Sequence, residues 1–189
     1  MAKAHNLPPN SVRGAIRLFI EQHAGELGDN VLEVGTRQHA AAAWWTSNRD
    51  LAVKDWLGID AQDGPGVDVV ADIQQLPAEW NKRFTGVVCS EVLEHVRSPQ
   101  DALCELHRVM QYNAVALFTT LTAFPLHAYP NDYRRWTEEG LRAELEMAGF
   151  VDIETFRAGS VTFNLNDHGE AGFTRLTCPV HVFAKAYRA

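Results

Sequence analysis

Compact apolar runs alternate along the chain with segments in which apolar residues recur every three or four positions. The compact runs are bounded by turn-forming residues, which is typical of buried strands, and the periodic segments are typical of amphipathic helices. Seven strands are expected, at residues 31–35, 56–60, 67–72, 84–90, 114–121, 151–156 and 180–187. Strands that alternate with helices form a parallel sheet with helices on both faces. The pattern therefore predicts a doubly wound, mostly parallel seven-stranded α/β sheet.

Helix start and stop signals accompany the periodic segments. Pro99 after Ser98 is typical of a helix start, and Gly149 is typical of a helix end. Helices are expected from Ser11 to about Gly25, from Ala40 to Trp45, from Ser98 to about Met110, and from Thr137 to Gly149. The last two strands are joined by a long connection, residues 158–178, without an obvious helix. One of these two strands is therefore expected to run antiparallel.

The length of 189 residues and the hydrophobic content of 46% suit one domain with a sizeable core. We interpret residues 1–27 as an N-terminal arm and helix. Residues 28–157 form the core that carries the ligand site. Residues 158–189 form a C-terminal connection and the last strand.

Charge and special residues exclude several classes of function. Seventeen Lys and Arg against 24 Asp and Glu give a net charge of −7, which argues against general binding to nucleic acid or to anionic membranes. No signal peptide and no membrane-spanning run is visible, so we expect a cytoplasmic protein. The three cysteines are far apart, and the eight histidines form neither an H-E-x-x-H motif nor a close cluster with cysteine. No metal site is predicted from this spacing.

Candidate ligand-binding residues stand where the predicted strands end, because ligands of such sheets bind outside the carboxyl ends of the strands. Carboxylates at four of these ends are expected to converge on one crevice: Glu33, Asp60, Asp72 and Glu91. The first strand is followed by only one glycine, Gly35, and no phosphate-binding loop occurs. This combination favours a ligand that carries a ribose but no phosphate. Asp60 would accept hydrogen bonds from both hydroxyls of the ribose.

Five segments resemble class I S-adenosylmethionine-dependent methyltransferases in their order and spacing. They read VLEVG, WLGID, VDVVADIQQLP, FTGVVCSEVLEHV and FPLHAYPNDYRRWTEEGLRAELEMAGF. The subgroup that they resemble is the type 11, ubiquinone-biosynthesis-like one, over roughly residues 28–157. The resemblance implies a Rossmann-like methyltransferase fold with an antiparallel last strand. It also implies S-adenosyl-L-methionine as the cofactor and transfer of a methyl group to an acceptor, for which we expect a small molecule.

The same resemblance implies roles for the residues at the strand ends. Glu33 and Gly35 would border the methionine moiety of the cofactor, and Asp60 would hold the ribose. Asp72 would take the adenine amino group, with Ile73 flanking the ring.

The fourth strand is followed by three more residues for which the resemblance implies a place. Ser90 and Glu91 would line the cofactor side of the pocket, and His95 follows in the same motif. Because acceptors of this fold lie after the fifth strand, we take His127 in that segment as the candidate general base.

The chain departs from the family's first motif, which usually reads E/D-x-G-x-G-x-G. The second and third glycines are replaced by Arg37 and His39. We hypothesise that Arg37 pairs with the methionyl carboxylate of the cofactor. The altered loop leaves an alternative open, namely a catalytically inactive methyltransferase-like binding or regulatory protein. A nucleotide-dependent oxidoreductase is the weakest alternative, because the phosphate loop is missing.

Overall fold

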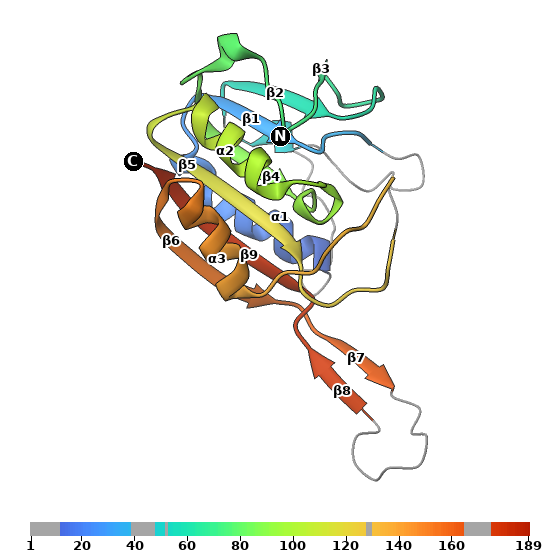
Figure 1. The fold of residues 1–189 in the computed structure, drawn as a ribbon. Coiled ribbons are helices and arrows are strands. Elements are labelled where there is room, and N and C mark those ends of the chain that lie inside the picture. The colour runs from blue at the N-terminus through green and yellow to red at the C-terminus, as the bar shows by residue number, and fades with distance from the viewer. Residues whose placement is uncertain (1–11, 39–47, 52, 128–129, 165–174) are drawn as a thin grey trace.

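The computed structural model describes residues 12–38, 48–51, 53–127, 130–164 and 175–189. Its centre is a seven-stranded sheet in the order β3-β2-β1-β4-β5-β9-β6 (Figure 1). The strands of this sheet are β1 (Asn30–Val34), β2 (Asp55–Asp60), β3 (Val69–Val70), β4 (Phe84–Ser90), β5 (Met110–Leu121), β6 (Phe150–Ala158) and β9 (His181–Arg188). The helices are α1 (Val12–His23), α2 (Pro99–Val109) and α3 (Glu138–Met147). The doubly wound fold predicted from the pattern is confirmed.

The pairing of the strands also confirms the expected antiparallel strand. The neighbours from β3 to β5 pair in parallel, whereas β9 is antiparallel to both β5 and β6. The chain passes from β6 to β9 through a hairpin, β7 (Val161–Asn164) and β8 (Arg175–Cys178), which extends away from the sheet (Figure 1). A hairpin returns the chain in the opposite direction, whereas a crossover helix would have kept it parallel.

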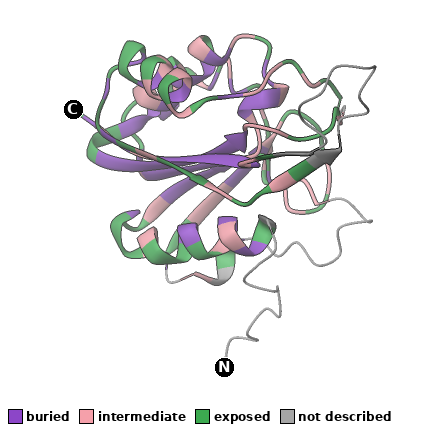
Figure 2. Ribbon diagram, turned by 90° about the horizontal axis from the view of Figure 1, so that it is seen from below, coloured by how far each residue is buried: buried purple, intermediate pink, exposed green. Residues whose placement is uncertain are grey.

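Helices cover both faces of the sheet, and each face has its own apolar core. On one face, Ile16, Phe19 and Ile20 of α1 pack against a cluster that includes Val31 and Val88. On the other face, apolar residues of α2 and α3 pack against the alternate side chains of the same strands. Figure 2 shows the buried strands enclosed between these helical layers. Because successive strand residues point to opposite faces, the strands at the centre of the sheet carry buried apolar residues on both faces, such as Val87 and Val88 of β4.

The ends of α3 agree with the sequence signals, and those of α2 agree in part. The Thr137 hydroxyl accepts a hydrogen bond from the Gly140 amide over 2.9 Å, and Gly149 follows α3 with a φ of +97°. Ser98 occupies the N-cap of α2, but its side chain makes no capping hydrogen bond. Its amide instead donates to the side chain of Gln74.

Several expectations about the strands and helices need correction, and others lie outside the described residues. The third strand is only Val69–Val70 rather than residues 67–72. Before it, the Asp68 side chain accepts a hydrogen bond from the Gly58 amide. The fifth strand begins at Met110, directly after α2. The β7–β8 hairpin was not expected within residues 158–178. The helix predicted from Ala40 to Trp45 and the arm before Val12 lie outside the described residues. Among the described helices, none has the length and apolarity needed to cross a membrane.

Candidate functional site

The carboxyl ends of four neighbouring strands lie side by side and form one edge of the sheet. Val34 at the end of β1 is in register with Ile59 of β2 and with Cys89 of β4. Ser90, the last residue of β4, is in register with Thr119 of β5. The predicted site residues that follow β1, β2 and β4 therefore meet at this edge, as expected for a parallel sheet.

The loop after β1 is held to the end of β2 through its backbone. The amides of Gly35 and Thr36 both donate to the Ile59 carbonyl, over 2.9 and 3.2 Å, and the Gln38 amide donates to the Pro65 carbonyl. Gly35 has a φ of +79°, and a Cβ there would lie 2.5 Å from Cγ2 of Val92. This position therefore requires glycine. His39, the last residue of the altered loop, lies outside the described residues.

Asp60 ends β2 with its carboxylate fixed by two backbone amides. Oδ2 accepts from the Arg37 amide over 3.2 Å, and Oδ1 accepts from the Gln62 amide over 3.0 Å. An ionised carboxylate has about four lone-pair sites, so these two bonds leave capacity for a ribose diol. The side chain is half-buried rather than enclosed, which leaves it accessible to a ligand.

The Arg37 side chain lies against the loop that follows β2. Its Nη1 donates to Oε1 of Gln62 over 2.6 Å, and its side chain is packed so closely to Gly64 that a Cβ there would meet it at 3.0 Å. The guanidinium therefore has a partner in the described residues, in an exposed position. Its pairing with a methionyl carboxylate stays a prediction.

Glu33 is the acid at the end of β1, and it is buried. Its Oε1 accepts from the Asn48 amide group over 2.7 Å, and Asn48 in turn accepts from Arg17 of α1. Among the described residues, Oε2 has no hydrogen-bond partner. Burial raises the pKa of Glu33, and the hydrogen bond from Asn48 and the charge of Arg49 oppose this rise. No sequence signal identified Asn48 as the residue that holds Glu33.

Asp72 and Ile73 follow β3 and differ in exposure. Asp72 is exposed, and its Oδ1 accepts from the Gln74 amide over 2.9 Å. Ile73 is buried in the core between the sheet and α2. The predicted contacts of both residues with adenine stay predictions.

Ser90 and Glu91 belong to a chain of hydrogen bonds that crosses from β4 to β9. The Thr119 hydroxyl donates to Oε1 of Glu91 over 3.0 Å, so the Ser90 hydroxyl donates to Thr119 over 2.8 Å. Oε2 of Glu91 lies 3.0 Å from Nε2 of His181, at the start of β9. Glu91 also interacts with Arg13 of α1 through charge. No sequence signal linked His181 or Arg13 to this site, because they lie far from Glu91 along the chain.

A second group of polar side chains lies after β4 and β5. Glu94, His95 and His127 each offer a ligand atom within 4.8 Å of the other two. Glu94 is fully buried, and its Oε2 accepts from the Thr120 hydroxyl over 2.8 Å. Burial and the nearby Glu91 carboxylate raise the pKa of Glu94. Sequence spacing did not predict this cluster, because His127 is far from the other two residues along the chain.

The segment after β5 is fixed over this second group. The His95 and His127 rings lie 5.0 Å apart, and Nδ1 of His95 donates to the Asn131 carbonyl. Asp132 accepts from the His127 amide and pairs with both terminal nitrogens of Arg135. The structure thus places His95 beside the candidate base His127. Its predicted place at the cofactor stays a prediction.

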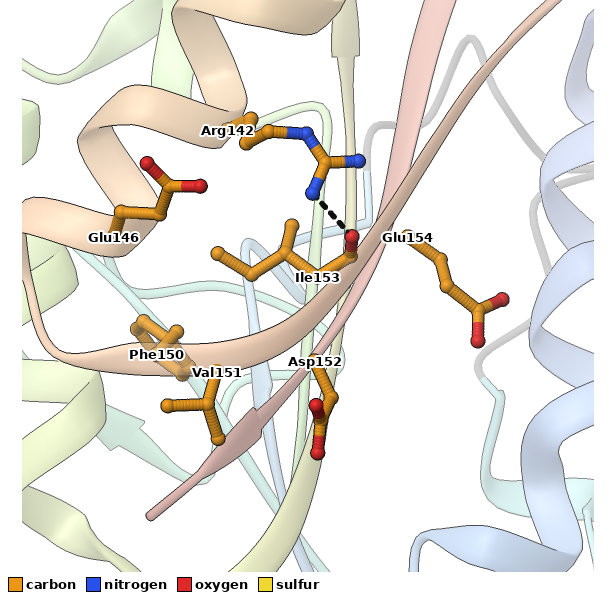
Figure 3. Close-up of a pocket in the computed structure, with 7 residues that line it drawn as sticks. All are labelled: Arg142, Glu146, Phe150, Val151, Asp152, Ile153 and Glu154. Carbon is orange, nitrogen blue, oxygen red and sulfur yellow. Dashed lines mark hydrogen bonds between the residues drawn. The ribbon is translucent and has the colours of Figure 1, made fainter.

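A separate hollow of about 660 Å³ lies between α3 and the first half of β6 (Figure 3). It is lined by Arg142, Glu146 and residues 150–154. Val151 of β6 is in register with Tyr187 of β9, which is paired with Val115 early in β5. The hollow is therefore at the sheet edge opposite to the carboxyl ends of the parallel strands, and the residues of the site do not line it.

Comparison with known proteins gives a family match and several structures of the same fold. A family described as a methyltransferase domain matches residues 7–158. One similar structure is that of the Burkholderia thailandensis 1,6-didemethyltoxoflavin-N1-methyltransferase with bound 1,6-didemethyltoxoflavin and S-adenosylhomocysteine. It is 15% identical to this chain with a TM-score of 0.67, and the match covers 95% of this chain and 79% of that chain. A SAM-dependent methyltransferase from Archaeoglobus fulgidus is 15% identical with a TM-score of 0.65, over 94% of this chain and 95% of that chain.

The fold is also found in a protein whose stated chemistry differs. The [4+2]-cyclase SpnF is 21% identical with a TM-score of 0.57, over 82% of this chain and 67% of that chain. At such identities the likeness concerns the fold alone, which does not determine the reaction. No curated protein sequence matches the chain.

Proposed function

The chain belongs to the methyltransferase-domain family and uses S-adenosylmethionine as its cofactor, and we propose that it methylates a small molecule. The acceptor would bind at the carboxyl ends of β4 and β5, beside His127. The observation that carries this proposal is the half-buried Asp60 carboxylate, which two backbone amides orient and whose remaining lone pairs suit a ribose diol.

The cofactor in this proposal lies across the ends of β1, β2 and β4. Asp60 holds the ribose, Asp72 and Ile73 border the adenine, and Glu33 and Gly35 border the methionine. Ser90 and Glu91 line the same pocket, and His95 extends it toward the segment after β5. Arg37 binds the methionyl carboxylate. To do so, its guanidinium gives up the hydrogen bond to Gln62 and forms one with the ligand.

Methyl transfer needs the acceptor to lie in line with the sulfonium, because the cofactor itself supplies the activated leaving group. A base is needed only when the acceptor arrives protonated. His127 is our candidate for that base, since its side chain remains 31% exposed and it lies in the segment that would border the acceptor. Exposed apolar side chains at Phe124, Leu126 and Tyr133 in the same segment suit an acceptor with apolar surface.

The experiment for this proposal measures methyl transfer from labelled S-adenosylmethionine to a panel of small-molecule acceptors. With an acceptor found, His127→Ala should lower turnover at least tenfold and leave the affinity for S-adenosylhomocysteine unchanged. His23, a partly buried residue at the end of α1 and far from this segment along the chain, provides the control variant His23→Ala, which should keep full turnover. Full turnover in His127→Ala would show that His127 is not the general base. No transfer to any acceptor would contradict the proposed function.

Two finer assignments belong to the same proposal. The CSEVLEHV motif favours the ubiquinone-biosynthesis-like subgroup. The free cysteines, one of them the exposed Cys104, suit a reducing compartment such as the cytoplasm.

One observation favours a second candidate, an inactive protein of the same fold that only binds its ligand. The amides of residues 35–38 all donate to groups of the β2 end and the loop after it. The loop therefore offers fewer free amides to a ligand carboxylate than a glycine-rich turn would. Cofactor binding without turnover on any acceptor would support this second candidate.

A further inference from the structure

Glu94, His95 and His127 come from two segments of the chain and converge at one point. Glu94 and His95 lie in the short 3-10 helix Leu93–His95 after β4, and His127 lies after β5. Nε2 of His95 is 3.9 Å from Oε1 of Glu94, and all three ligand atoms are within 4.8 Å of one another. In a tetrahedral zinc site the nitrogen and oxygen ligands are about 3.3 Å apart, so only small side-chain movements separate this cluster from that geometry.

The buried carboxylate in this cluster has one oxygen without a partner. Oε2 of Glu94 is occupied by Thr120, whereas Oε1 has no hydrogen-bond partner within the described part of the chain. Glu94 is fully buried. An unpartnered buried carboxylate oxygen is costly unless a cation or a donor meets it. Oε1 lies 3.9 Å from Nε2 of His95, and a cation bound between the two atoms would satisfy it.

Each of the three side chains also has a second polar group beside it, as ligands of a metal usually do. The Asn131 carbonyl can only accept, so Nδ1 of His95 carries the proton and Nε2 keeps its lone pair free. Nδ1 of His127 lies 3.3 Å from Oδ2 of Asp132, and Arg135 fixes that carboxylate in turn. Thr120 donates a hydrogen bond to Glu94. Hydrogen bonds therefore orient Glu94 and His95 before any ion arrives, and the Asp132 carboxylate lies within ion-pair distance of His127.

We propose that Glu94, His95 and His127 bind a divalent first-row transition metal ion such as zinc. Two imidazole nitrogens and one carboxylate oxygen suit Zn²⁺ or Fe²⁺ far better than Mg²⁺ or Ca²⁺, which prefer oxygen ligands alone. Three protein ligands leave at least one position of the ion open, which is the composition of a catalytic rather than a structural site.

The open position gives the metal a role at the acceptor, and this step rests on the proposed function. The ion would lie at the carboxyl ends of β4 and β5, where the acceptor is proposed to bind. A hydroxyl of the acceptor bound to the ion would lose its proton more readily. His127 would then act as a ligand, and the metal would replace it as the group that activates the acceptor.

Zinc binding to the full chain tests the inference without any turnover. Metal-free protein is titrated with Zn²⁺ against a chromophoric chelator, and Mg²⁺ serves as the control ion. The wild type should bind one Zn²⁺ that His127→Gln and Glu94→Gln each weaken at least tenfold. His23→Gln, which changes a histidine paired with Glu26 at the end of α1, should leave the affinity unchanged. X-ray absorption of the zinc-loaded wild type should show two imidazole ligands, and that of His127→Gln only one.

Folding is checked separately by thermal unfolding of each variant without metal. If Glu94→Gln does not fold, His127→Gln decides the matter, since its side chain is partly exposed. Absence of zinc binding by the wild type, or equal affinity in the wild type and His127→Gln, overturns the inference. If the protein binds zinc at this site but transfers no methyl group, this inference holds and the proposed function is contradicted. If the protein transfers a methyl group but binds no zinc, the proposed function holds and this inference is overturned.

Discussion

The backbone amide of Arg37 donates a hydrogen bond to Oδ2 of Asp60 over 3.2 Å. The loop after β1 and the carboxylate at the end of β2 are thereby joined through a group that every residue except proline possesses. The side chain at position 37 is thus free to differ from glycine without loss of this contact. The Asp60 carboxylate keeps its orientation although the glycine-rich motif of the family is incomplete.

Removal of the Arg37 side chain isolates its contribution to cofactor binding. Arg37→Ala keeps the amide that orients Asp60 and removes only the guanidinium. Loss of a charge-assisted hydrogen bond costs about 1.5–3 kcal/mol, so the dissociation constant for S-adenosylhomocysteine should rise at least tenfold. Calorimetric titration measures this change. Gln62→Ala, which removes the partner of the guanidinium but not its charge, is the control and should change the constant less than threefold. An unaltered constant in Arg37→Ala would refute the assignment.

Gly35 should tolerate no side chain. Its φ of +79° and the 2.5 Å approach of a Cβ to Val92 both oppose Gly35→Ala. Strain of this kind costs about 1–3 kcal/mol, and urea denaturation should show that loss in the free energy of unfolding. Gly25→Ala is the matched control, because a Cβ there meets nothing within 4 Å, and its stability should not fall. Val92→Ala removes the side chain that the new Cβ would meet. Adding Gly35→Ala to the Val92→Ala variant should therefore lower the free energy of unfolding less than adding Gly35→Ala to the wild type does. A Gly35→Ala variant as stable as the wild type would show that the loop adopts another conformation.

The buried Glu33 should make stability depend on pH in a defined direction. Burial raises its pKa above the ordinary 4.5. Between that pH and the raised pKa, the folded state keeps a proton that the unfolded state has released. The free energy of unfolding therefore falls as the pH rises through this interval, by about 1.4 kcal/mol for each unit of pKa elevation.

Glu33→Gln should abolish this contribution. The free energy of unfolding of Glu33→Gln, relative to that of the wild type, should increase as the pH rises above about 4.5, as measured by chemical denaturation at several pH values. Glu79→Gln, at an exposed position, is the control and should follow the wild type at every pH. Parallel curves for Glu33→Gln and the wild type would mean that Glu33 titrates normally in the folded protein.

Much of the fold was predictable because strands and helices carry local signals. Apolar runs predicted the seven strands of the sheet, and Thr137 and Gly149 correctly marked the ends of α3. The β7–β8 hairpin was missed, since its strands pair only with each other and lack a compact apolar run. The third strand was predicted too long, because only Val69 and Val70 pair with β2 as a strand, and the Asp68 side chain accepts a hydrogen bond from the Gly58 amide of β2.

Only those residues of the candidate site that directly follow a strand in the sequence were predictable. Residues that directly follow strands, such as Asp60 and Ser90, were found because a parallel sheet brings its strand ends together. Partners that approach from elsewhere were not found: His181 comes from β9, and Asn48 from the short 3-10 helix Asn48–Asp50. The pairing of His95 with His127 depends on the path of the segment after β5, which no local pattern reports.

The binding of S-adenosylhomocysteine to the wild type and to Asp60→Ala, measured by calorimetry, tests the proposed site most directly. Asp60 should provide the charged acceptors for both ribose hydroxyls, and hydrogen bonds to charged groups contribute about 1.5–3 kcal/mol each. The wild type should bind one equivalent, and Asp60→Ala should bind at least tenfold more weakly. Asp63→Ala, which removes a nearby exposed charge, should bind as the wild type does. Equal affinity in Asp60→Ala and the wild type, with both folded, would contradict the proposed site.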